Sequence, residues 1–223
     1  MSGTNRAPLE YHLRELDIAE DRQSDRQSLP EVQPTCRRLL DVGCGIGQSL
    51  IALKLSPSVE AHGVDIDEEA VAFGASRSPH LHLRAGSGEA LPYADQYFDM
   101  VMCRVSLPYM HVPTALHEFH RVLRPGGQLW LTLHPMSMFR RDFAAAVRDG
   151  SVRGVVYRLY ALFNTVLLFA GRQMRFPFNR ARIESYQPRM VIRRQLQHAG
   201  FRDVKGWVAG DQSLVTASRA QAS

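Results

Sequence analysis

The chain has 223 residues, of which 45% are hydrophobic and 22% charged, and its formal net charge is +5. This length and composition fit one globular unit with at most a modest insertion, and they exclude an intrinsically disordered chain. Three cysteines without a Cys-x-x-Cys pair exclude a disulfide framework and a cysteine zinc site, and they fit a reducing cytoplasm.

Residues 1–35 are expected to form a short amphipathic helix and a linker. Apolar side chains recur at helical spacing over Leu9–Ile18, and a polar stretch then ends at Pro30 and Pro34. Charged residues stand where a signal peptide needs an apolar core, so we expect no export signal and a cytoplasmic protein.

Residues 36–135 alternate short apolar runs with helical stretches, which is the pattern of a parallel α/β sheet. Strands are predicted at 38–43, 59–66, 80–86, 98–105 and 128–134, and helices at 50–55, 68–76 and 113–123. Residues 188–223 add a predicted helix at 189–199 and two final strands, one of them antiparallel. The predicted fold class is α/β, a doubly wound, mostly parallel Rossmann-like sheet of about seven strands with helices on both faces and an inserted helical lid.

The lid is assigned to residues 136–187, which the sheet pattern does not require. Within it, Gly154–Gly171 has apolar residues nearly all round a predicted helix, so this helix has to bury itself somewhere. Its shortness and Arg158 disfavour a membrane span. Around it, Arg140–Lys205 carries 14 Arg or Lys residues and four acidic ones.

A glycine-rich turn follows the first predicted strand at Gly43, Gly45 and Gly47. Such turns bring backbone close to a ligand, and the N–H groups of the next helix can bind it. Asp65 ends the second strand, where a carboxylate can accept hydrogen bonds from ribose hydroxyls. The dinucleotide fingerprint needs glycine where Gln48 stands, so these residues alone leave a methyl donor and a dinucleotide both open.

Four segments in order and spacing resemble the class I S-adenosylmethionine-dependent methyltransferases, in particular the broad small-molecule group that includes quinone-biosynthesis enzymes. The likeness covers about residues 38–134, with a weaker likeness in Leu196–Val204. The segments are LLDVGCGIG at 39–47, GVDID at 63–67, EALPYADQYFDMV at 89–101 and HRVLRPGG at 120–127.

The resemblance implies that S-adenosylmethionine is the cofactor and S-adenosylhomocysteine its product. Asp65 would then hold the ribose and Ile66 would cover the adenine. The family often has Asp-Ala beside the adenine, whereas this chain has Ser87 and Gly88, so a hydroxyl would replace the carboxylate. The residues implied to hold the methionine part are Asp41, Gly43, Gly45 and Gly47.

Cys103 and Arg104 follow the fourth strand, where the resemblance implies that backbone meets the methionine amino group of the cofactor and that side chains begin to face the acceptor. The next residues, Ser106–Tyr109, read SLPY, whereas nucleic-acid amino-methyltransferases have Asp/Asn/Ser-Pro-Pro-Tyr/Phe. Leu107 breaks that match, so we do not expect a nucleic-acid substrate and assign Leu107 and Tyr109 to a pocket wall or the core.

The methyl acceptor is predicted from the lid. An apolar helix with a basic rim favours a small hydrophobic acceptor that can carry a carboxylate or phosphate, with peripheral membrane contact as a further expectation. No metal is required, because a sulfonium carries its own leaving group. For a hydroxyl acceptor the candidate general bases are His134, Tyr109 and His111, which follow the strands at the ligand edge.

Two other functions stay open on the sequence. The fold could bind S-adenosylmethionine as a regulatory ligand without catalysis, or it could be a dinucleotide-dependent oxidoreductase. The sequence specifies neither the acceptor atom nor the oligomeric state.

Overall fold

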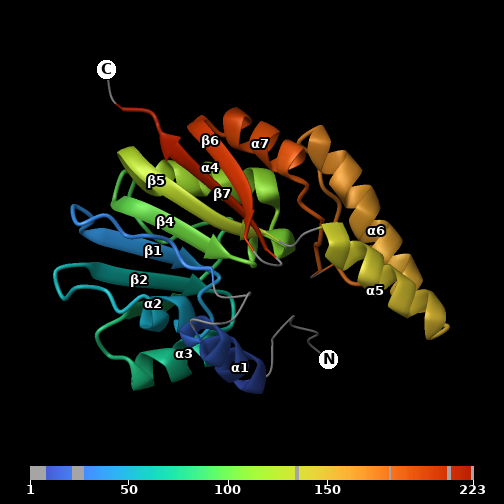
Figure 1. Ribbon diagram of the computed structural model, residues 1–223, viewed down its shortest axis with the longest axis horizontal. Coiled ribbons are helices and arrows are strands. Elements are labelled where there is room, and N and C mark those ends of the chain that lie inside the picture. The colour runs from blue at the N-terminus through green and yellow to red at the C-terminus, as the bar shows by residue number, and fades with distance from the viewer. Residues whose placement is uncertain (1–8, 22–27, 134–135, 181, 210–211, 222–223) are drawn as a thin grey trace.

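The computed structural model describes residues 9–21, 28–133, 136–180, 182–209 and 212–221. Seven strands form one sheet in the order β3-β2-β1-β4-β5-β7-β6 (Figure 1). The strands are β1 (Arg38–Val42), β2 (Glu60–Asp65), β3 (His82–Ala85), β4 (Phe98–Arg104), β5 (Leu123–Leu133), β6 (Phe201–Ala209) and β7 (Gln212–Arg219). The helices are α1 (Leu9–Glu20), α2 (Gln48–Ala52), α3 (Glu68–Arg77), η1 (Leu107–Tyr109), α4 (Val112–Val122), α5 (Met136–Arg148), α6 (Val152–Phe169) and α7 (Arg189–His198).

The sheet is mixed. Strands β1 to β5 are paired in parallel, whereas β7 runs antiparallel to both β5 and β6. This arrangement confirms the predicted doubly wound class with one antiparallel strand near the C-terminus. The carboxyl ends of β1, β2 and β4 therefore meet at one edge of the sheet, where ligands bind in open α/β folds.

Hydrophobic cores lie on both faces of the sheet. Leu39 belongs to the core on the side of α2, and its neighbour Leu40 belongs to the core on the side of α4 and α7. Both side chains are fully buried, because successive residues of a strand point to opposite faces and here each face is covered by helices.

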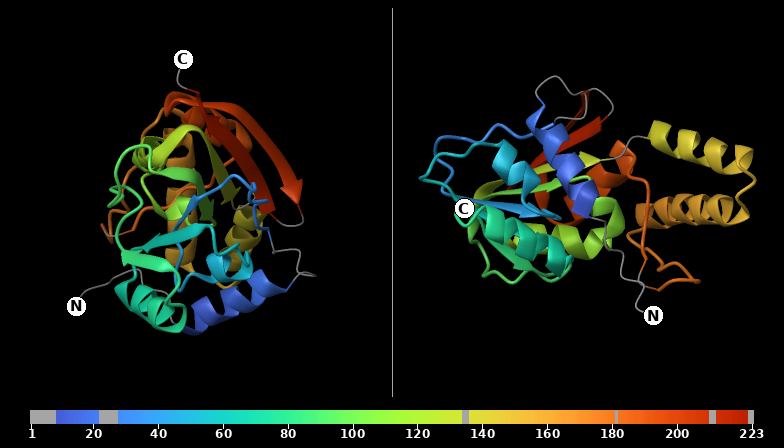
Figure 2. Two further views of the ribbon diagram at one scale, coloured as in Figure 1. Left: turned by 90° about the vertical axis from the view of Figure 1, so that its left-hand side faces the viewer. Right: turned by 90° about the horizontal axis from the view of Figure 1, so that it is seen from below.

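The predicted helical insertion is confirmed as two helices, α5 and α6, which stand away from the sheet side by side (Figures 1 and 2). Helix α5 has no buried residue, and the buried residues of α6 are Ala161, Asn164, Thr165 and Leu168. Asn164 donates hydrogen bonds to the carbonyls of Met174 (2.8 Å) and Glu184 (3.0 Å), which attaches α6 to the segment leading back to the sheet.

Candidate cofactor and acceptor site

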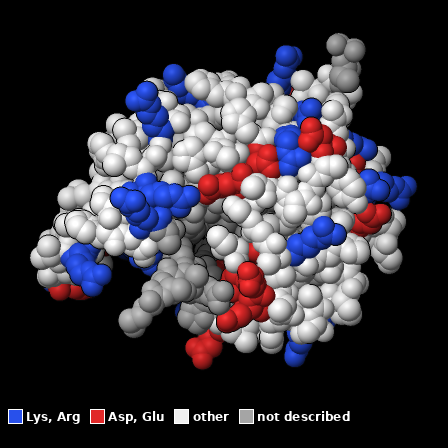
Figure 3. Space-filling view, turned by 180° about the vertical axis from the view of Figure 1, so that it is seen from behind, with Lys and Arg blue, Asp and Glu red and all other residues white. Residues whose placement is uncertain are grey.

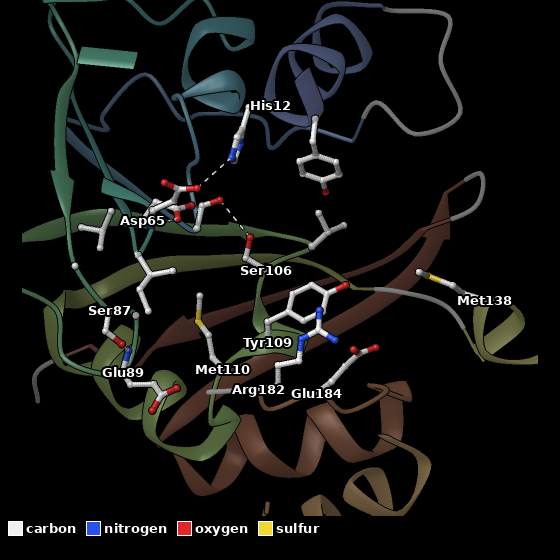
Figure 4. A pocket seen from close by; sticks show the side chains of 18 of the residues that line it. His12, Asp65, Ser87, Glu89, Ser106, Tyr109, Met110, Met138, Arg182 and Glu184 are labelled. Atoms are coloured by element: carbon white, nitrogen blue, oxygen red, sulfur yellow. Dashed lines mark hydrogen bonds and ion pairs between the residues drawn. The ribbon is translucent and has the colours of Figure 1, made fainter. Parts of the chain in front are cut away.

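A cavity of about 610 Å³ lies at the carboxyl edge of the sheet (Figure 4). It has two ends. The glycine-loop end is lined by Tyr11, His12, Gly43, Asp65, Ser87 and Ser106, and the hairpin end by Tyr109, Met138, Tyr157, Arg158, Arg182 and Glu184. Residues that are far apart in the sequence thus share one chamber, because α1 and the α5–α6 hairpin both reach the same edge of the sheet.

The glycine-rich turn has the backbone that its sequence predicts. Gly43, Gly45 and Gly47 have φ angles of +80°, +54° and +86°, a region that other residues seldom adopt. A Cβ atom at Gly43 would collide with the Ser106 side chain, and one at Gly45 would collide with His12. The turn therefore requires glycine, because an added side chain would meet Ser106 or His12 at the cavity wall. Gly43 lines the cavity directly, whereas Gly45 and Gly47 shape the turn behind it.

Asp65 holds the turn and faces the cavity. Its Oδ2 accepts from the Gly45 N–H at 2.7 Å, and its Oδ1 accepts from the Asp67 N–H at 2.9 Å. Each carboxylate oxygen keeps a second lone pair, so Asp65 can also accept two ligand hydroxyls. Ile66 beside it is 74% exposed and lines the cavity, as expected of a residue that covers a flat ring.

Asp41 is almost completely buried, and neither of its carboxylate oxygens has a hydrogen-bond partner among the described residues. Burial raises the pKa of this carboxyl to about 7, although the nearby Arg104 opposes the rise. A buried carboxyl of this kind is satisfied by a cationic donor. The cation beside Asp41 is Arg104, and Asp41 itself does not line the cavity, so Gly43 and Asp65 carry the fit to S-adenosylmethionine.

The other predicted cofactor residues divide into two pairs. Ser87 and Gly88 line the cavity, and the Ser87 hydroxyl accepts from the Glu89 N–H at 3.1 Å. Cys103 and Arg104 have buried side chains that do not line it, because Cys103 faces the core and Arg104 forms an ion pair with Glu15 of α1. These positions leave the predicted backbone contact untested, and neither side chain faces the acceptor end of the cavity.

Two of the three candidate bases lie within the described residues. Tyr109 lines the cavity, and burial together with the charge of Glu184 raises the pKa of its phenol, which makes it a poor base. His111 does not line the cavity, and its Nδ1 lies 2.7 Å from Thr114 Oγ1. His134 lies outside the described residues.

A carboxylate that the sequence reasoning missed lies at the hairpin end. Glu184 is buried, and its Oε2 accepts a 2.6 Å hydrogen bond from the Tyr157 hydroxyl. Its Oε1 lies 3.4 Å from Arg158, which also pairs with Asp142 of α5 at 3.3 Å. Burial and the Glu184 hydrogen bond raise the pKa of Tyr157, so Tyr157 stays protonated and donates this hydrogen bond to Glu184.

His12 is the second missed residue, and it lies on α1 at the opposite end of the cavity. Its imidazole is buried, neither ring nitrogen has a hydrogen-bond partner among the described residues, and Nε2 lies 3.9 Å from Asp67 Oδ2 (Figure 4). An unsatisfied imidazole at the cavity wall suits a ligand carboxylate or hydroxyl. The only sequence signal was the amphipathic helix that carries it.

Comparison with known proteins matches residues 40–131 to the family of methyltransferase domains. A demethylmenaquinone methyltransferase of Chlorobaculum parvum is 25% identical over 171 residues, which cover 74% of this chain and 66% of that protein. A ubiquinone/menaquinone biosynthesis C-methyltransferase of Dinoroseobacter shibae is 37% identical over 101 residues, 42% of this chain and 40% of that protein. The chain thus spans slightly less than two thirds of the first of these relatives.

A solved structure shares the fold over nearly the whole chain. It is an S-adenosylmethionine-dependent methyltransferase of Thermotoga maritima, described as a possible histamine N-methyltransferase, with a TM-score of 0.64 and 17% identity over 95% of both chains. The structural likeness therefore extends well beyond the matched domain of residues 40–131.

Proposed function

The chain belongs to the class I S-adenosylmethionine-dependent methyltransferases, and we propose that it transfers a methyl group from S-adenosylmethionine to a small hydrophobic acceptor. One observation carries the proposal. The glycine turn and Asp65 share a single cavity with the aromatic and methionine side chains of the hairpin end. A donor held at the first end would face an acceptor held at the second, as direct transfer requires.

The cofactor supplies a methyl group on a sulfonium, which leaves as a neutral thioether. The protein has to bind the donor and the acceptor, align the acceptor atom with the methyl group and exclude water. Gly43 would contact the methionine part, Asp65 would hold the ribose and Ile66 would cover the adenine, whereas Asp41 does not line the cavity. Tyr11 and His12 of α1 line the same end, so α1 closes this part of the cavity from solvent.

The acceptor's chemistry is inferred from the hairpin end. Tyr109, Met110 and Met138 give this part of the cavity a largely apolar wall, and Arg182 adds a positive charge, whereas Arg158 is already paired with Glu184 and Asp142. This combination suits a hydrophobic ring or chain that bears a phenol, carboxylate or phosphate. Two similar proteins are named for quinone methylation, so a demethylated quinone is a reasonable first compound to test.

Glu184 is our proposed proton acceptor for a hydroxyl or acidic-carbon substrate. It lines the cavity, and the Tyr157 hydroxyl and Arg158 hold its carboxylate in place. As the acceptor attacks the methyl group, its proton would pass to Glu184, and the hydrogen bond from Tyr157 would orient the carboxylate.

The test is to incubate the protein with S-adenosylmethionine labelled in the methyl group and a metabolite extract, and then to separate the organic-soluble products from the aqueous ones. We expect label in a small organic-soluble product. Label found only in nucleic acid or protein would overturn the proposed acceptor class.

A second measurement separates the competing functions. Absence of transfer to any fraction, together with tight binding of S-adenosylhomocysteine, would indicate a regulatory binding protein. Thermal stabilisation by NAD and not by S-adenosylhomocysteine would indicate a dinucleotide enzyme. The variant Asp65→Ala controls for labelling that does not depend on this site, because it should bind neither donor nor product well.

A further inference from the structure

One face of α6 is apolar and open to solvent. Helical spacing places its exposed apolar side chains in one stripe, and each is between 42% and 75% exposed. The stripe consists of Val152, Val156, Leu159, Phe163 and Val166. Phe169 at the end of the helix is also 42% exposed. Solvent-exposed helix faces are normally polar, so a continuous apolar stripe indicates a surface that something covers.

The helix meets a length and hydropathy criterion for crossing a membrane, yet only 22% of its residues are buried in the protein. A core helix of the same composition would be mostly buried. The opposite face of α6 is occupied, because Tyr157 and Arg158 line the cavity and Asn164 holds the returning chain. Because the other face is attached to the protein, only the stripe can contact a membrane or a partner molecule.

Exposed arginines flank the stripe along the chain. Arg153 lies at the start of α6, and the segment that follows the helix exposes Arg172, Arg175 and Arg180. The same segment exposes Phe178, whose side chain is 82% accessible. Figure 3, a view from the side on which α6 lies, shows a largely uncharged lobe with Lys and Arg groups at its base and, beside an acidic group, at its tip. The segment Val152–Phe169 contains no Asp or Glu.

We propose that the α6 stripe and its arginines dock the protein on the surface of an anionic lipid bilayer, with α6 lying in the plane of the headgroups. Apolar side chains would enter the acyl boundary while the guanidinium groups meet lipid phosphates. A second copy of the chain is disfavoured, because two-fold pairing of the stripes would bring basic margins together. A span is disfavoured because Tyr157, Arg158 and Asn164 on the other face are committed to the protein.

Docking would hold the cavity at the membrane surface, because α6 carries the stripe on one face and lines the cavity with the other. A lipid-soluble acceptor could then enter the hairpin end without crossing water. This consequence rests on the proposed function, whereas docking itself does not.

The test is sedimentation of the full chain with vesicles of phosphatidylcholine alone or mixed with phosphatidylglycerol. We expect binding to the mixed vesicles that salt weakens. The double variant Leu159→Ser/Phe163→Ser should lower the partition coefficient at least about tenfold, because two apolar side chains no longer enter the bilayer. Its matched control is Trp207→Ser/Val208→Ser, which alters two exposed apolar residues of β6 and should change nothing.

The charge contribution has its own matched pair. Arg172→Glu/Arg180→Glu should weaken binding to the mixed vesicles and reduce its salt dependence. Arg202→Glu/Lys205→Glu on β6 makes the same change in net charge and should have a much smaller effect. Thermal unfolding of each variant verifies that it is folded, and none of these readouts requires methyl transfer.

Four results would overturn the proposal. Wild-type protein could fail to bind mixed vesicles, or the stripe variant could bind as well as wild type. The third is a dimer that the stripe variant abolishes, which would identify a second copy as the occupant. Protein that high salt and alkaline carbonate fail to release would contradict surface docking and indicate insertion.

Discussion

Glu15 of α1 and Arg104 of β4 form a buried ion pair, with 3.1 Å between Oε2 and Nη2. Arg104 also donates from Nε to the Ser49 hydroxyl at 3.2 Å. The pair joins the N-terminal helix to the end of a central strand beneath the glycine turn. Because His12 and Tyr11 are carried by α1, the ion pair fixes the wall of the cavity at its glycine-loop end.

Glu15→Gln should destabilise the protein by about 3 kcal/mol, because it removes the carboxylate that pairs with the buried guanidinium of Arg104. It should also weaken binding of S-adenosylhomocysteine, since α1 no longer closes the cavity. Urea unfolding and calorimetric titration measure the two effects. Glu20→Gln removes the same charge from an exposed position of α1 and should leave both unchanged. If Glu15→Gln and Glu20→Gln had the same stability and the same affinity for S-adenosylhomocysteine, the ion pair would not hold α1 in place.

Gly43→Ala tests the glycine turn. A methyl group at this position meets the Ser106 side chain, and the residue has a positive φ, so we expect at least a tenfold loss of S-adenosylhomocysteine affinity, roughly 1.4 kcal/mol. Gly150→Ala shares the positive φ (+61°) but has nothing within 4 Å of the added carbon. This control should lose stability by about 1 kcal/mol and keep its affinity. Calorimetry measures the affinity of both variants for S-adenosylhomocysteine. An equal loss of affinity in Gly150→Ala would contradict a specific role of Gly43 in cofactor binding.

Glu184→Gln should lower kcat by about two orders of magnitude and leave the Kd of S-adenosylhomocysteine unchanged, because Glu184 acts at the hairpin end only. Tyr157→Phe should give a smaller loss, since it removes one hydrogen bond that orients the carboxylate. Asp149→Asn neutralises an exposed carboxylate near the hairpin tip and is the control. If Glu184→Gln lowered the affinity for S-adenosylhomocysteine as much as it lowers kcat, Glu184 would act at the glycine-loop end of the cavity and not at the hairpin end.

Asp41 predicts a specific pH dependence of stability. Its carboxyl pKa rises from 3.8 in the unfolded chain to about 7 in the folded protein, so the folded state binds more protons between these values. Stability from this group is therefore present at low pH and is lost as pH rises toward 7. Asp41→Asn has no carboxyl to deprotonate, so it does not lose stability as the pH rises. Its free energy of unfolding relative to wild type should therefore increase by up to about 1.4 kcal/mol per pH unit over this range.

Urea unfolding of both proteins across that pH range checks the Asp41 prediction. Asp17→Asn, at an exposed position of α1, is the control, and its difference from wild type should not vary with pH. A constant difference for Asp41→Asn would show that the carboxyl titrates normally in the folded protein.

Local patterns predicted most of the fold. The alternation through Leu39 and Leu40 requires burial on both faces, and each of the seven observed strands overlaps a predicted one. The start of β5 was missed, because Pro125-Gly126-Gly127 is typical of a turn. The strand begins at Leu123, which pairs with Phe98 before the register shifts. Helix α5 was not predicted individually, since a helix without buried residues has only a weak apolar pattern.

The site likewise contains residues that the sequence predicted and residues that it did not. Gly43 and Asp65 were predicted because their roles depend on local backbone and on a strand end, both visible in a short motif. Glu184 and His12 reach the cavity through tertiary packing of the hairpin and of α1, and no spacing in the sequence encodes that approach. The ion pair of Arg104 with Glu15 bridges 89 residues, so its side chain could not be placed from its position after a strand.

The measurement that tests the central claim most directly is the stoichiometry of one reaction mixture that contains S-adenosylmethionine and a candidate acceptor such as a demethylated quinone or an organic extract. Mass spectrometry would count S-adenosylhomocysteine formed and methylated small molecule gained. A methyltransferase with this site predicts equal amounts of the two products, and loss of both in Asp65→Ala. Tight binding of S-adenosylhomocysteine without any formation of it, across acceptors, would contradict the claim.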